Sequence, residues 1–533
     1  MGEVLLRISA ALVTAMLCCM AGMKMLGVLQ QSGYKNAGFL RWLKKKDNMY
    51  YNRLAVLSLC LVLSTVLVSL CLSFLGTRGA LALSAIPFFG FLLIFCYVDG
   101  KYALKVPLYF TKRIGRLGAV HFFLTACVAY IFIAVLGFLA DVNGSFIYGL
   151  LAYAPFAFLP MLLPFILCLA NAIDGVFERK HNEKFIKRAG QVLDETKIIR
   201  VGIVGSYGKT SVKNILKTLL SEKYSVVETP ASYNTPIGIA KTVFSPEFEK
   251  KEVLIAEMGA RKKGDISELC GMVKPDYAVF TGVCKQHLET FGTLKNVYAE
   301  KSEILKSSAK TVVCGIGLKE YIQETQQAAN VIYADGAELS NVTFTATQTE
   351  FSLKLDGGTF DVKTKLLGKA AVENILLSVK LAQALGLTTD EIERGLSKLQ
   401  PIAHRLQLVE ENGVYILDDG YNCNPKGAEE GLDALARFEG RKCIVTPGIV
   451  ECGILEREMN CELGEKIAKR KFDKVILVGN TLVGAVKEGY LNAGGEKGSL
   501  AMAQTLEEAQ KMLAEWVMRG DAVLFLNDLP DLY

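Results

Sequence analysis

The sequence contains only four histidines and no Cys-x-x-Cys pair among its 533 residues. A structural zinc site is built from closely spaced Cys and His ligands, so this absence speaks against one. The fourteen cysteines divide evenly, seven before Asp174 and seven after it. This distribution indicates free, mostly buried thiols in a reducing compartment rather than a disulfide framework. Internal repeats and low-complexity linkers are also absent.

No basic stripe runs along the chain, so the net charge of +6 does not indicate a nucleic-acid partner. With 51% hydrophobic residues, the composition is too apolar for a purely soluble protein. The excess lies before Asp174, in five stretches that are long enough, or nearly so, to cross the core of a bilayer. These stretches are residues 8–23, 54–75, 80–98, 117–140 and 146–173. No small-residue cleavage site follows the first stretch, so we expect a retained helix rather than a signal peptide.

Basic residues gather in three of the segments that flank these stretches. They follow the first stretch (Lys35, Arg41, Lys44, Lys45, Lys46, Arg53), the third (Lys101, Lys105, Lys112, Arg113, Arg116) and the fifth (Arg179, Lys180, Lys184, Lys187, Arg188). The other two connections carry only Arg78 as a base. By the positive-inside rule, we predict a multi-pass membrane protein with its N-terminus outside and everything after the fifth stretch in the cytoplasm.

After the apolar part, a charged segment at residues 178–192 favours a helix. Strand-like runs at residues 199–204, 253–256, 277–281 and 311–314 then alternate with helical patterns. Such alternation predicts a mainly parallel, doubly wound sheet. We further expect a β-hairpin within residues 342–367 and paired helices at residues 370–385 and 389–399.

A second α/β unit follows, with strands expected at residues 414–418, 442–446, 475–478 and 522–525. Its alternation is Rossmann-like, but no Gly-x-Gly-x-x-Gly follows the first strand, so a dinucleotide cofactor is not supported. The predicted organisation is therefore a helical membrane domain over residues 1–177, a central doubly wound α/β domain over residues 178–400 and a Rossmann-like C-terminal α/β domain over residues 401–533.

The clearest motif is Val-Gly-Ile-Val-Gly-Ser-Tyr-Gly-Lys-Thr-Ser, residues 201–211. A buried strand enters a tight glycine turn, and Lys209 and Thr210 open a helix whose first amides can hold phosphate. In a P-loop the lysine neutralises the β and γ phosphates and the threonine hydroxyl binds Mg²⁺. The motif therefore predicts a nucleotide site, with Gly205, Ser206, Gly208 and Ser211 completing the loop. Without further residues, an ordinary strand-to-helix turn remains an alternative.

Three more residues have the right chemistry to complete such a site. Glu257 ends a predicted strand, at the sheet edge where ligands bind, and its carboxylate can bind Mg²⁺. His287 follows the strand at residues 277–281, and Lys301 comes fourteen residues later. Taken singly, each has a structural explanation: a solvated strand end, a loop histidine and a surface helix charge.

Their order and spacing change this interpretation, because the sequence over residues 199–525 resembles the Mur ligase family, closest to the branch that adds D-alanyl-D-alanine. The matching segments are Gly-Ser-Tyr-Gly-Lys-Thr-Ser, Tyr-Asn-Thr-Pro-Ile-Gly (233–238), Glu-Met-Gly-Ala (257–260), Lys-Pro-Asp (274–276), His-Leu-Glu-Thr-Phe-Gly (287–292), Glu-Lys-Ser-Glu-Ile (300–304), Glu-Asn-Ile-Leu (373–376), His-Arg-Leu-Gln (404–407) and Asp-Asp-Gly-Tyr-Asn-Cys-Asn-Pro (418–425). Ala370 and Ala371 stand at the two positions where the family usually has His-Asn.

The resemblance implies an ATP-dependent ligase with two Mg²⁺ ions. The implied ATP and phosphate ligands are the P-loop residues with Lys209, then Asn374, Arg405 at the γ-phosphate and Asp419 at the ribose. The implied metal ligands are Thr210, Glu257, His287 and Lys301, which the family often carbamylates. Asn234 is implied to approach the acceptor substrate.

The resemblance also implies the reaction. The γ-phosphoryl group is moved onto a carboxylate, and an amine attacks the resulting acyl phosphate. Soluble members bind a uridine nucleotide through an N-terminal domain, whose place is taken here by the apolar stretches. We therefore expect a carboxylate acceptor held in the bilayer, such as a lipid-linked peptidoglycan precursor at the bacterial plasma membrane. The amine remains open among an amino acid, a dipeptide and ammonia.

An ATP-driven transporter is disfavoured, because stretches two to five lack charged residues in their cores and no Leu-Ser-Gly-Gly motif follows the P-loop. A scaffold that retains the ligase fold to bind a partner is disfavoured by the intact motif residues. An amidating ligase supplied with ammonia by a glutamine amidotransferase and a polyglutamate-type ligase both remain open.

Overall fold

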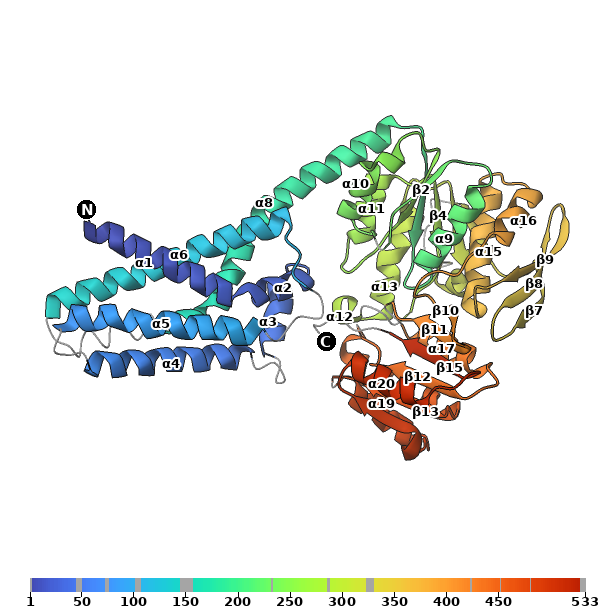
Figure 1. Cartoon of the computed structure of the whole chain (residues 1–533). Coiled ribbons are helices and arrows are strands. Elements are labelled where there is room, and N and C mark those ends of the chain that lie inside the picture. The colour runs from blue at the N-terminus through green and yellow to red at the C-terminus, as the bar shows by residue number, and fades with distance from the viewer. Residues whose placement is uncertain are drawn as a thin grey trace. The chain divides into compact units, whose positions relative to one another are not determined.

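The computed structural model describes residues 2–44, 50–71, 76–100, 107–143, 157–231, 233–284, 288–322, 330–421, 424–450, 452–479 and 481–527. Contacts divide the chain into two compact units, with the boundary between Asn182 and Glu183. Helices make up the first unit, and strands with helices make up the second (Figure 1).

The first unit consists of long helices and two short ones. They are α1 (Gly2–Ala21), α2 (Met23–Gln31), α3 (Asn36–Lys44), α4 (Tyr50–Cys71), α5 (Gly76–Gly100), α6 (Lys112–Asn143) and α8 (Leu159–Glu195), of which α8 continues past the boundary. By length and composition, four segments of the described residues could cross a membrane: Val4–Ala21, Tyr50–Val68, Lys112–Val135 and Leu159–Glu195. A shorter apolar segment, Ile86–Asp99, lies within α5. The fifth predicted stretch comprises residues 146–173. Its residues 146–156 lie outside the described residues, and its residues 159–173 belong to α8.

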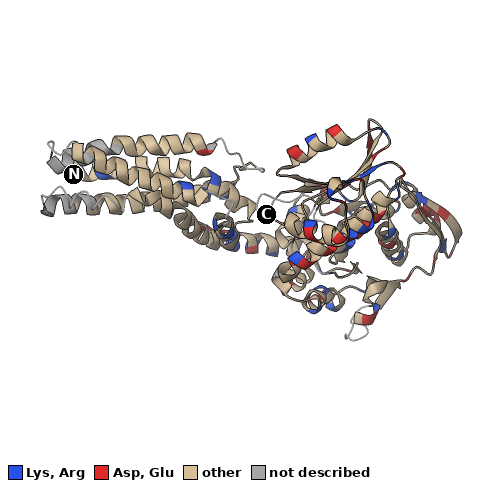
Figure 2. Cartoon of the chain, turned by 90° about the horizontal axis from the view of Figure 1, so that it is seen from below, with Lys and Arg blue, Asp and Glu red and all other residues tan. Residues whose placement is uncertain are grey.

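Charged residues are distributed differently in the two units. In the described part of the first unit, most of the Lys, Arg, Asp and Glu residues lie toward one end of the helices, whereas in the second unit they are spread over many elements (Figure 2). The helix sides of the first unit expose large apolar residues such as Leu63, Leu67 and Phe123. This pattern is opposite to that of a water-soluble helical bundle.

The second unit begins with a six-stranded sheet in the order β2-β3-β1-β4-β5-β6, in which every pair is parallel. Its strands are β1 (Ile199–Val204), β2 (Val226–Glu228), β3 (Val253–Glu257), β4 (Tyr277–Phe280), β5 (Thr311–Gly315) and β6 (Asn330–Ala334). The helices on its two faces are α9 (Lys209–Leu220), α10 (Pro236–Val243), α11 (Asp265–Val273), α12 (Leu288–Phe291), α13 (Leu294–Lys301), α14 (Lys319–Ile322), α15 (Lys369–Ala384) and α16 (Thr389–Ser397).

Both faces of this sheet are buried, which explains why its strands are nearly continuous apolar runs. Along β3, Val253 and Ile255 pack in the core shared with α9, α15 and α16, while Leu254 and Ala256 pack in the core shared with α10, α11 and α13. The predicted doubly wound α/β architecture is therefore confirmed.

The expected hairpin is a three-stranded antiparallel sheet of β7 (Leu339–Phe344), β8 (Thr349–Leu355) and β9 (Gly358–Thr364). A second six-stranded sheet follows in the order β10-β11-β15-β12-β13-β14, parallel except for the pair β10 and β11. Its elements are β10 (Gln407–Glu411), β11 (Val414–Asp419), α17 (Pro425–Ala436), β12 (Lys442–Thr446), α18 (Glu456–Lys469), β13 (Lys474–Val478), α19 (Val483–Asn492), β14 (Leu500–Ala503), α20 (Leu506–Trp516) and β15 (Ala522–Leu526).

Candidate functional site

The P-loop lies between the central strand β1 and the start of α9. Gly208 adopts φ +74° immediately before the helix, and a Cβ added there would lie 2.5 Å from the Asn374 side-chain oxygen. At Gly205, with φ +155°, an added Cβ would lie 1.9 Å from the Thr281 hydroxyl oxygen. Both positions therefore require glycine for the close approach as well as for the backbone angle. The Lys209 ammonium donates to the Gly205 carbonyl at 2.9 Å, so its charge lies within the loop.

This loop has the features of a phosphate cradle. The amides at the N-terminus of α9 face it, and they attract anions together with the helix dipole. The Ser206 hydroxyl oxygen is buried, with no hydrogen-bond partner among the described residues. A phosphate oxygen would supply the missing partner, so the residues present fit a bound nucleotide triphosphate.

Glu257 lies at the C-terminal end of β3, beside β1, and is buried. One of its carboxylate oxygens accepts a hydrogen bond from the Thr210 hydroxyl at 3.0 Å, and the other accepts one from the Asn234 amide at 3.2 Å. Mg²⁺ is commonly bound by one or two protein oxygens together with substrate phosphates. Thr210 and Glu257 fit that ligand set. Among the described residues, no group of three or more His, Cys, Asp or Glu side chains is placed to bind a metal ion by itself.

Lys213 is a part of this site that the sequence interpretation missed. It lies one turn after Lys209 on α9, and its side chain is only 2% exposed. Its ammonium donates to the carbonyl oxygens of Thr229 and Ala231 at 2.7 and 2.6 Å, and it lies 3.6 Å from the Glu257 carboxylate. The spacing of four residues from Lys209 places the two lysines on one helix face and was the available signal.

Lys301 ends α13 and is 1% exposed. Burial lowers the pKa of its ammonium to about 7, and the neighbouring charge of Lys209 acts in the same direction, while Cys284 and Glu300 oppose the shift. A lysine of this kind is largely neutral at slightly alkaline pH, so its nitrogen can act as a nucleophile. His287, the other predicted metal ligand on this side, lies outside the described residues.

The remaining predicted ATP ligands come from the other side of the P-loop. A cavity of about 120 Å³ is lined by Gly208, Ser211, Asn374, Arg405 and Asp419, among others. The Arg405 guanidinium donates to the Tyr421 carbonyl at 3.0 Å and lies 4.6 Å from the centre of the Tyr421 ring. The Asp419 carboxylate accepts the Leu406 amide at 3.1 Å, which fixes it beside the segment that carries Arg405.

A second cavity opens on the same arginine. It is lined by Thr210 and Lys213 from α9 and by residues 398–405, and Arg405 therefore contributes to both cavities. The structure thus brings Gly208 and Ser211 of the P-loop together with Asn374, Arg405 and Asp419 around one cavity. Thr210 lines the second cavity, and its hydroxyl is hydrogen-bonded to Glu257, which also accepts the Asn234 amide.

Three further residues join the two α/β sheets beside this opening. Lys426, at the start of α17, donates to the Glu373 carboxylate on α15 at 2.7 Å and lies 4.4 Å from the centre of the Tyr207 ring in the P-loop. Sequence analysis did not single out Lys426, Glu373 or Tyr207 individually. A local sequence pattern does not predict the contact of Lys426 with Glu373 and Tyr207, because the three residues are far apart in the chain.

Comparisons with known proteins agree with this arrangement. Residues 203–382 match the family model of the Mur ligase middle domain, and residues 404–527 match that of the Mur ligase, glutamate ligase domain. The UDP-N-acetylmuramoyl-tripeptide–D-alanyl-D-alanine ligase of Bacillus subtilis is 28% identical over 333 residues, which cover 61% of this chain and 72% of that relative. The ligase of the same name from Escherichia coli is 28% identical, over 52% of this chain and 64% of the relative.

Among solved structures, the MurF ligase from Thermotoga maritima in complex with ADP has a TM-score of 0.59 at 29% identity, covering 65% of this chain and 80% of that one. The chain spans 64% to 72% of the length of the two curated relatives described above.

Proposed function

The chain belongs to the Mur ligase family over residues 203–382 and 404–527, and from this premise we propose that it joins an amine to a carboxylate acceptor held in a membrane. As a member of this family it is an ATP-dependent ligase that forms carbon–nitrogen bonds. The proposal concerns the substrates, the location and the roles of individual residues. It assigns residues 1–177 to membrane attachment, 178–400 to ATP binding and 401–533 to the second catalytic domain.

One observation carries the catalytic part of the proposal: Arg405, from the C-terminal domain, lines the same cavities as the P-loop residues Gly208 and Thr210. A triphosphate between them would meet positive charge from both domains. A carboxylate is a poor electrophile, so transfer of the γ-phosphoryl group to it is the step that needs this charge. Lys209 binds the β and γ phosphates, and Arg405 stabilises the γ-phosphoryl group as it moves.

The other residues bind and orient the reactants. Asn374 and Asp419 hold the nucleoside, and the Asn234 amide orients the Glu257 carboxylate and approaches the acceptor. Thr210 and Glu257 would hold a first Mg²⁺, and His287 and Lys301 a second. Bound Mg²⁺ offsets the negative charge of the phosphates and of the acceptor carboxylate. An amine then attacks the acyl phosphate, phosphate leaves and the new amide is released.

Lys301 is proposed to be carbamylated. The neutral nitrogen attacks carbon dioxide, one proton is released, and the product is an N-carboxylate in place of a cation. Two facts support this assignment: Lys301 is nearly fully buried, and its pKa is lowered to about 7. The change removes the repulsion between Lys301 and Lys209 and supplies an anionic oxygen ligand suited to Mg²⁺.

The membrane part of the proposal depends on composition. Among the described residues, four segments are long and apolar enough to cross a bilayer, α5 adds a shorter one, and most of the charged residues of this unit lie toward one end. We place the protein in a bacterial plasma membrane with its N-terminus outside and the ligase domains in the cytoplasm, where ATP is available. The acceptor is then a lipid-linked cell-wall precursor at the inner leaflet.

The relatives named above act, by their names, on a UDP-linked tripeptide and D-alanyl-D-alanine. D-Alanyl-D-alanine is therefore our first candidate for the amine. Ammonia supplied by a glutamine amidotransferase and glutamate are the alternatives. Mass spectrometry of lipid-linked precursors in cells that lack the protein separates them: a missing terminal dipeptide, a missing amide or a missing glutamate chain would each identify one amine.

The full chain, purified in detergent, tests the catalytic proposal. We expect ADP release only when a lipid-linked muramoyl-tripeptide and an amine are both present. Lys209→Ala should lower the rate at least about 100-fold, since one donor aimed at developing charge has an effect of this size. Lys466→Ala is the matched control, because Lys466 lies on α18, pairs with Glu429 and lines neither cavity. Equal ADP release by the parent and Lys209→Ala without acceptor would refute the proposal.

A further inference from the structure

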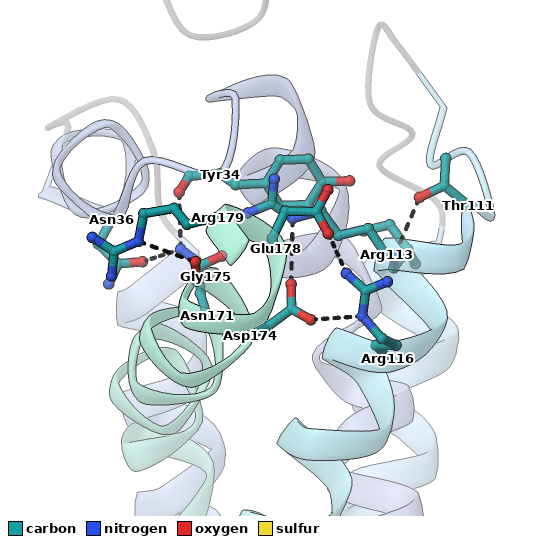
Figure 3. A network of polar contacts seen from close by, with 11 residues as sticks. Tyr34, Asn36, Thr111, Arg113, Arg116, Asn171, Asp174, Gly175, Glu178 and Arg179 are labelled. Atoms are coloured by element: carbon teal, nitrogen blue, oxygen red, sulfur yellow. Dashed lines mark hydrogen bonds and ion pairs between the residues drawn. The ribbon is translucent and has the colours of Figure 1, made fainter. Parts of the chain in front are cut away.

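Cations in the described part of the chain differ in whether the chain itself compensates their charge. Arg116, on α6, pairs with Asp174 on α8 at 3.1 Å and also with Glu178 (Figure 3). Arg113 lies 3.3 Å from the same Asp174 carboxylate. Carboxylates of the chain therefore compensate these two arginines, which do not require an external anion.

A set of six cations in the second unit has no such partner, and we call it the basic face. Each of them is exposed, and none of their side chains makes an ion pair or a hydrogen bond to another described residue. The members are Lys184, Lys187 and Arg188 on α8, Lys241 on α10, and Arg261 and Lys263 in the loop between β3 and α11. Six exposed cations without carboxylate partners leave the basic face with positive charge that an external anion can compensate.

Contacts with aromatic rings join the parts of the basic face on α8 and α10. The Phe185 and Phe244 ring centres lie 5.0 Å apart, and the Arg188 guanidinium lies 5.8 Å from the centre of the Phe244 ring. The Lys241 ammonium lies 5.7 Å from the centre of the Tyr233 ring. Phe244 and Tyr233 are 38% and 40% exposed. Exposed aromatic rings between cations suit a surface that binds at a membrane interface.

The loop between β3 and α11 extends the basic face to Asn234, the residue proposed above to approach the acceptor. The Gly259 amide, at the start of this loop, donates to the Asn234 carbonyl oxygen at 2.8 Å. The Asp265 carboxylate accepts the backbone amides of Arg261 and of the following residue at 2.8 and 2.9 Å. These bonds fix the backbone of the loop beside Asn234, while the Arg261 side chain is left without a partner among the described residues.

The first cations of the basic face follow closely on the last apolar residues of α8. Phe177 is 66% exposed, and Lys184 comes seven residues later on the same helix. At 1.5 Å per residue, the two lie about 10 Å apart along the helix axis. If α8 leaves the bilayer after Phe177, as the proposed membrane location implies, Lys184 lies about one Debye length from the lipid headgroups.

We propose that the basic face docks on anionic phospholipid headgroups and so brings the acceptor-facing edge of the ligase to the bilayer surface. The inference rests on the membrane location proposed above. Charge complementarity supports it, because each lysine or arginine near an anionic bilayer adds to the attraction. Continuity supports it as well, because the face begins on a helix whose first half is an apolar segment. A lipid-linked acceptor in the same leaflet would then meet Asn234 without leaving the bilayer.

Hydrogen–deuterium exchange of the full chain in nanodiscs, without ATP or acceptor, tests the docking. Nanodiscs of phosphatidylcholine are compared with nanodiscs of equal parts phosphatidylcholine and phosphatidylglycerol. We expect the amides of residues 233–245 and 259–264 to exchange about fivefold more slowly in the anionic nanodiscs. At high salt, where the Debye length falls to about 3 Å, this slowing should disappear.

Two double variants remove charge from different parts of the basic face. One combines Lys187→Gln with Arg188→Gln, and the other combines Arg261→Gln with Lys263→Gln. All four positions are exposed, so we expect both proteins to fold, and unchanged exchange in β12 and β13 verifies it. Each variant should lose most of the slowing that the parent shows in anionic nanodiscs.

The matched control combines Lys487→Gln on α19 with Lys511→Gln on α20. Both lysines are exposed and make no ion pair with another described residue, so the control removes the same charge away from the basic face. It should keep the slowing of the parent. Equal exchange of the parent in the two kinds of nanodisc, or the same loss of slowing in the control, would overturn the proposal.

Inorganic diphosphate, added to the phosphatidylcholine nanodiscs, separates lipid headgroups from a second source of phosphate, the acceptor itself. We expect it to leave the exchange of the basic face unchanged. Slowing by diphosphate as strong as that by phosphatidylglycerol would also overturn the proposal, because it would assign the basic face to a phosphate-bearing substrate.

The assay separates this inference from the proposed function, because it measures docking and not ligation. If the parent ligates a lipid-linked acceptor while its exchange does not respond to phosphatidylglycerol, the docking falls and the function stands. If the exchange responds as expected but no acceptor is ligated, the function falls and the docking stands.

Discussion

At the scale of single residues, the buried cation Lys213 is the least expected part of the ligase site. Its three contacts, with two carbonyl oxygens and the Glu257 carboxylate, are all made by one ammonium group. Lys213→Met keeps most of the side-chain volume and removes the charge, which leaves two acceptors and a carboxylate without their donor. We expect the free energy of unfolding to fall by about 2–4 kcal/mol, measured by denaturant titration.

The same substitution should also change the metal dependence of the reaction. Because Lys213 helps to hold Glu257 in place, the Mg²⁺ concentration for half-maximal ADP release should rise, while saturating Mg²⁺ restores most of the rate. Lys466→Met is the control, since Lys466 pairs with Glu429 in the C-terminal domain and lines neither cavity of the site. An unchanged Mg²⁺ requirement in a folded Lys213→Met protein would show that the lysine only stabilises the fold.

Lys301 gives the site a pH dependence. Its pKa is lowered to about 7, so the amine is protonated below that pH and cannot form a carbamate. Initial rates of ADP release should therefore fall about tenfold per pH unit below 7, and added carbon dioxide should move the midpoint to lower pH. A midpoint that does not respond to carbon dioxide would contradict carbamylation.

The free energy of unfolding should also depend on the titration of Lys301, but above pH 7 rather than below it. Because the folded-state pKa lies below the unfolded value, the unfolded chain binds more protons between pH 7 and about 10. The contribution of Lys301 to stability therefore rises with pH across this window. In Lys301→Met, the free energy of unfolding, measured by denaturant titration, should therefore rise less between pH 7 and about 10 than in the parent.

The sequence predicted the residues of the site whose position follows from local structure. Gly208, Lys209 and Thr210 follow a buried strand and open a helix, and Glu257 ends the neighbouring parallel strand, so topology alone brings them to one edge. Lys213 was missed because helical spacing shows which residues share a face, but it does not show that a loop carbonyl will cover that face.

At the scale of elements, the strands that the sequence predicted and those it missed differ in position. The eight strands expected in the two large sheets are all present, and the four that were not expected, β2, β6, β10 and β14, are the edge strands of these sheets. An inner strand is buried on both faces and reads as an apolar run. An edge strand such as β10, with most of its residues exposed, lacks that signal.

The sequence did not predict the contact of Lys426 with Glu373 and Tyr207 between the two α/β domains. A substitution of Lys426 tests whether this contact supports ATP binding. Lys426→Ala removes the hydrogen bond to Glu373 and the cation over the Tyr207 ring, both at partly exposed positions. Together these interactions contribute about 1 kcal/mol, so we expect the KM for ATP to rise about fivefold with little change in kcat.

The control for this contact is Lys466→Ala, which removes an ion pair between Lys466 and Glu429 within the C-terminal domain. It should leave the KM for ATP unchanged. If both variants change the KM equally, the effect of Lys426 is on the stability of the C-terminal domain and not on its contact with the P-loop.

At the scale of the whole molecule, the chain combines the two Mur ligase domains with an N-terminal helical unit that the family matches do not cover. The family matches cover residues 203–382 and 404–527, and the first unit lies before them. Membrane attachment would restrict the acceptor to substrates at the bilayer surface. Such an acceptor would not need a UDP group by which the enzyme recognises it. The choice of acceptor is therefore the property in which this protein should differ from the two relatives whose names specify a UDP-linked tripeptide.

The most direct measurement compares two acceptors with the same full chain in detergent. One acceptor is a lipid-linked muramoyl-tripeptide, and the other is the corresponding UDP-linked tripeptide, each supplied with ATP, Mg²⁺ and D-alanyl-D-alanine. We predict that the mass of the lipid-linked acceptor increases by one dipeptide less water, with one ADP formed per product, while the UDP-linked acceptor is left unchanged. Ligation of the UDP-linked acceptor at an equal or higher rate would contradict the account.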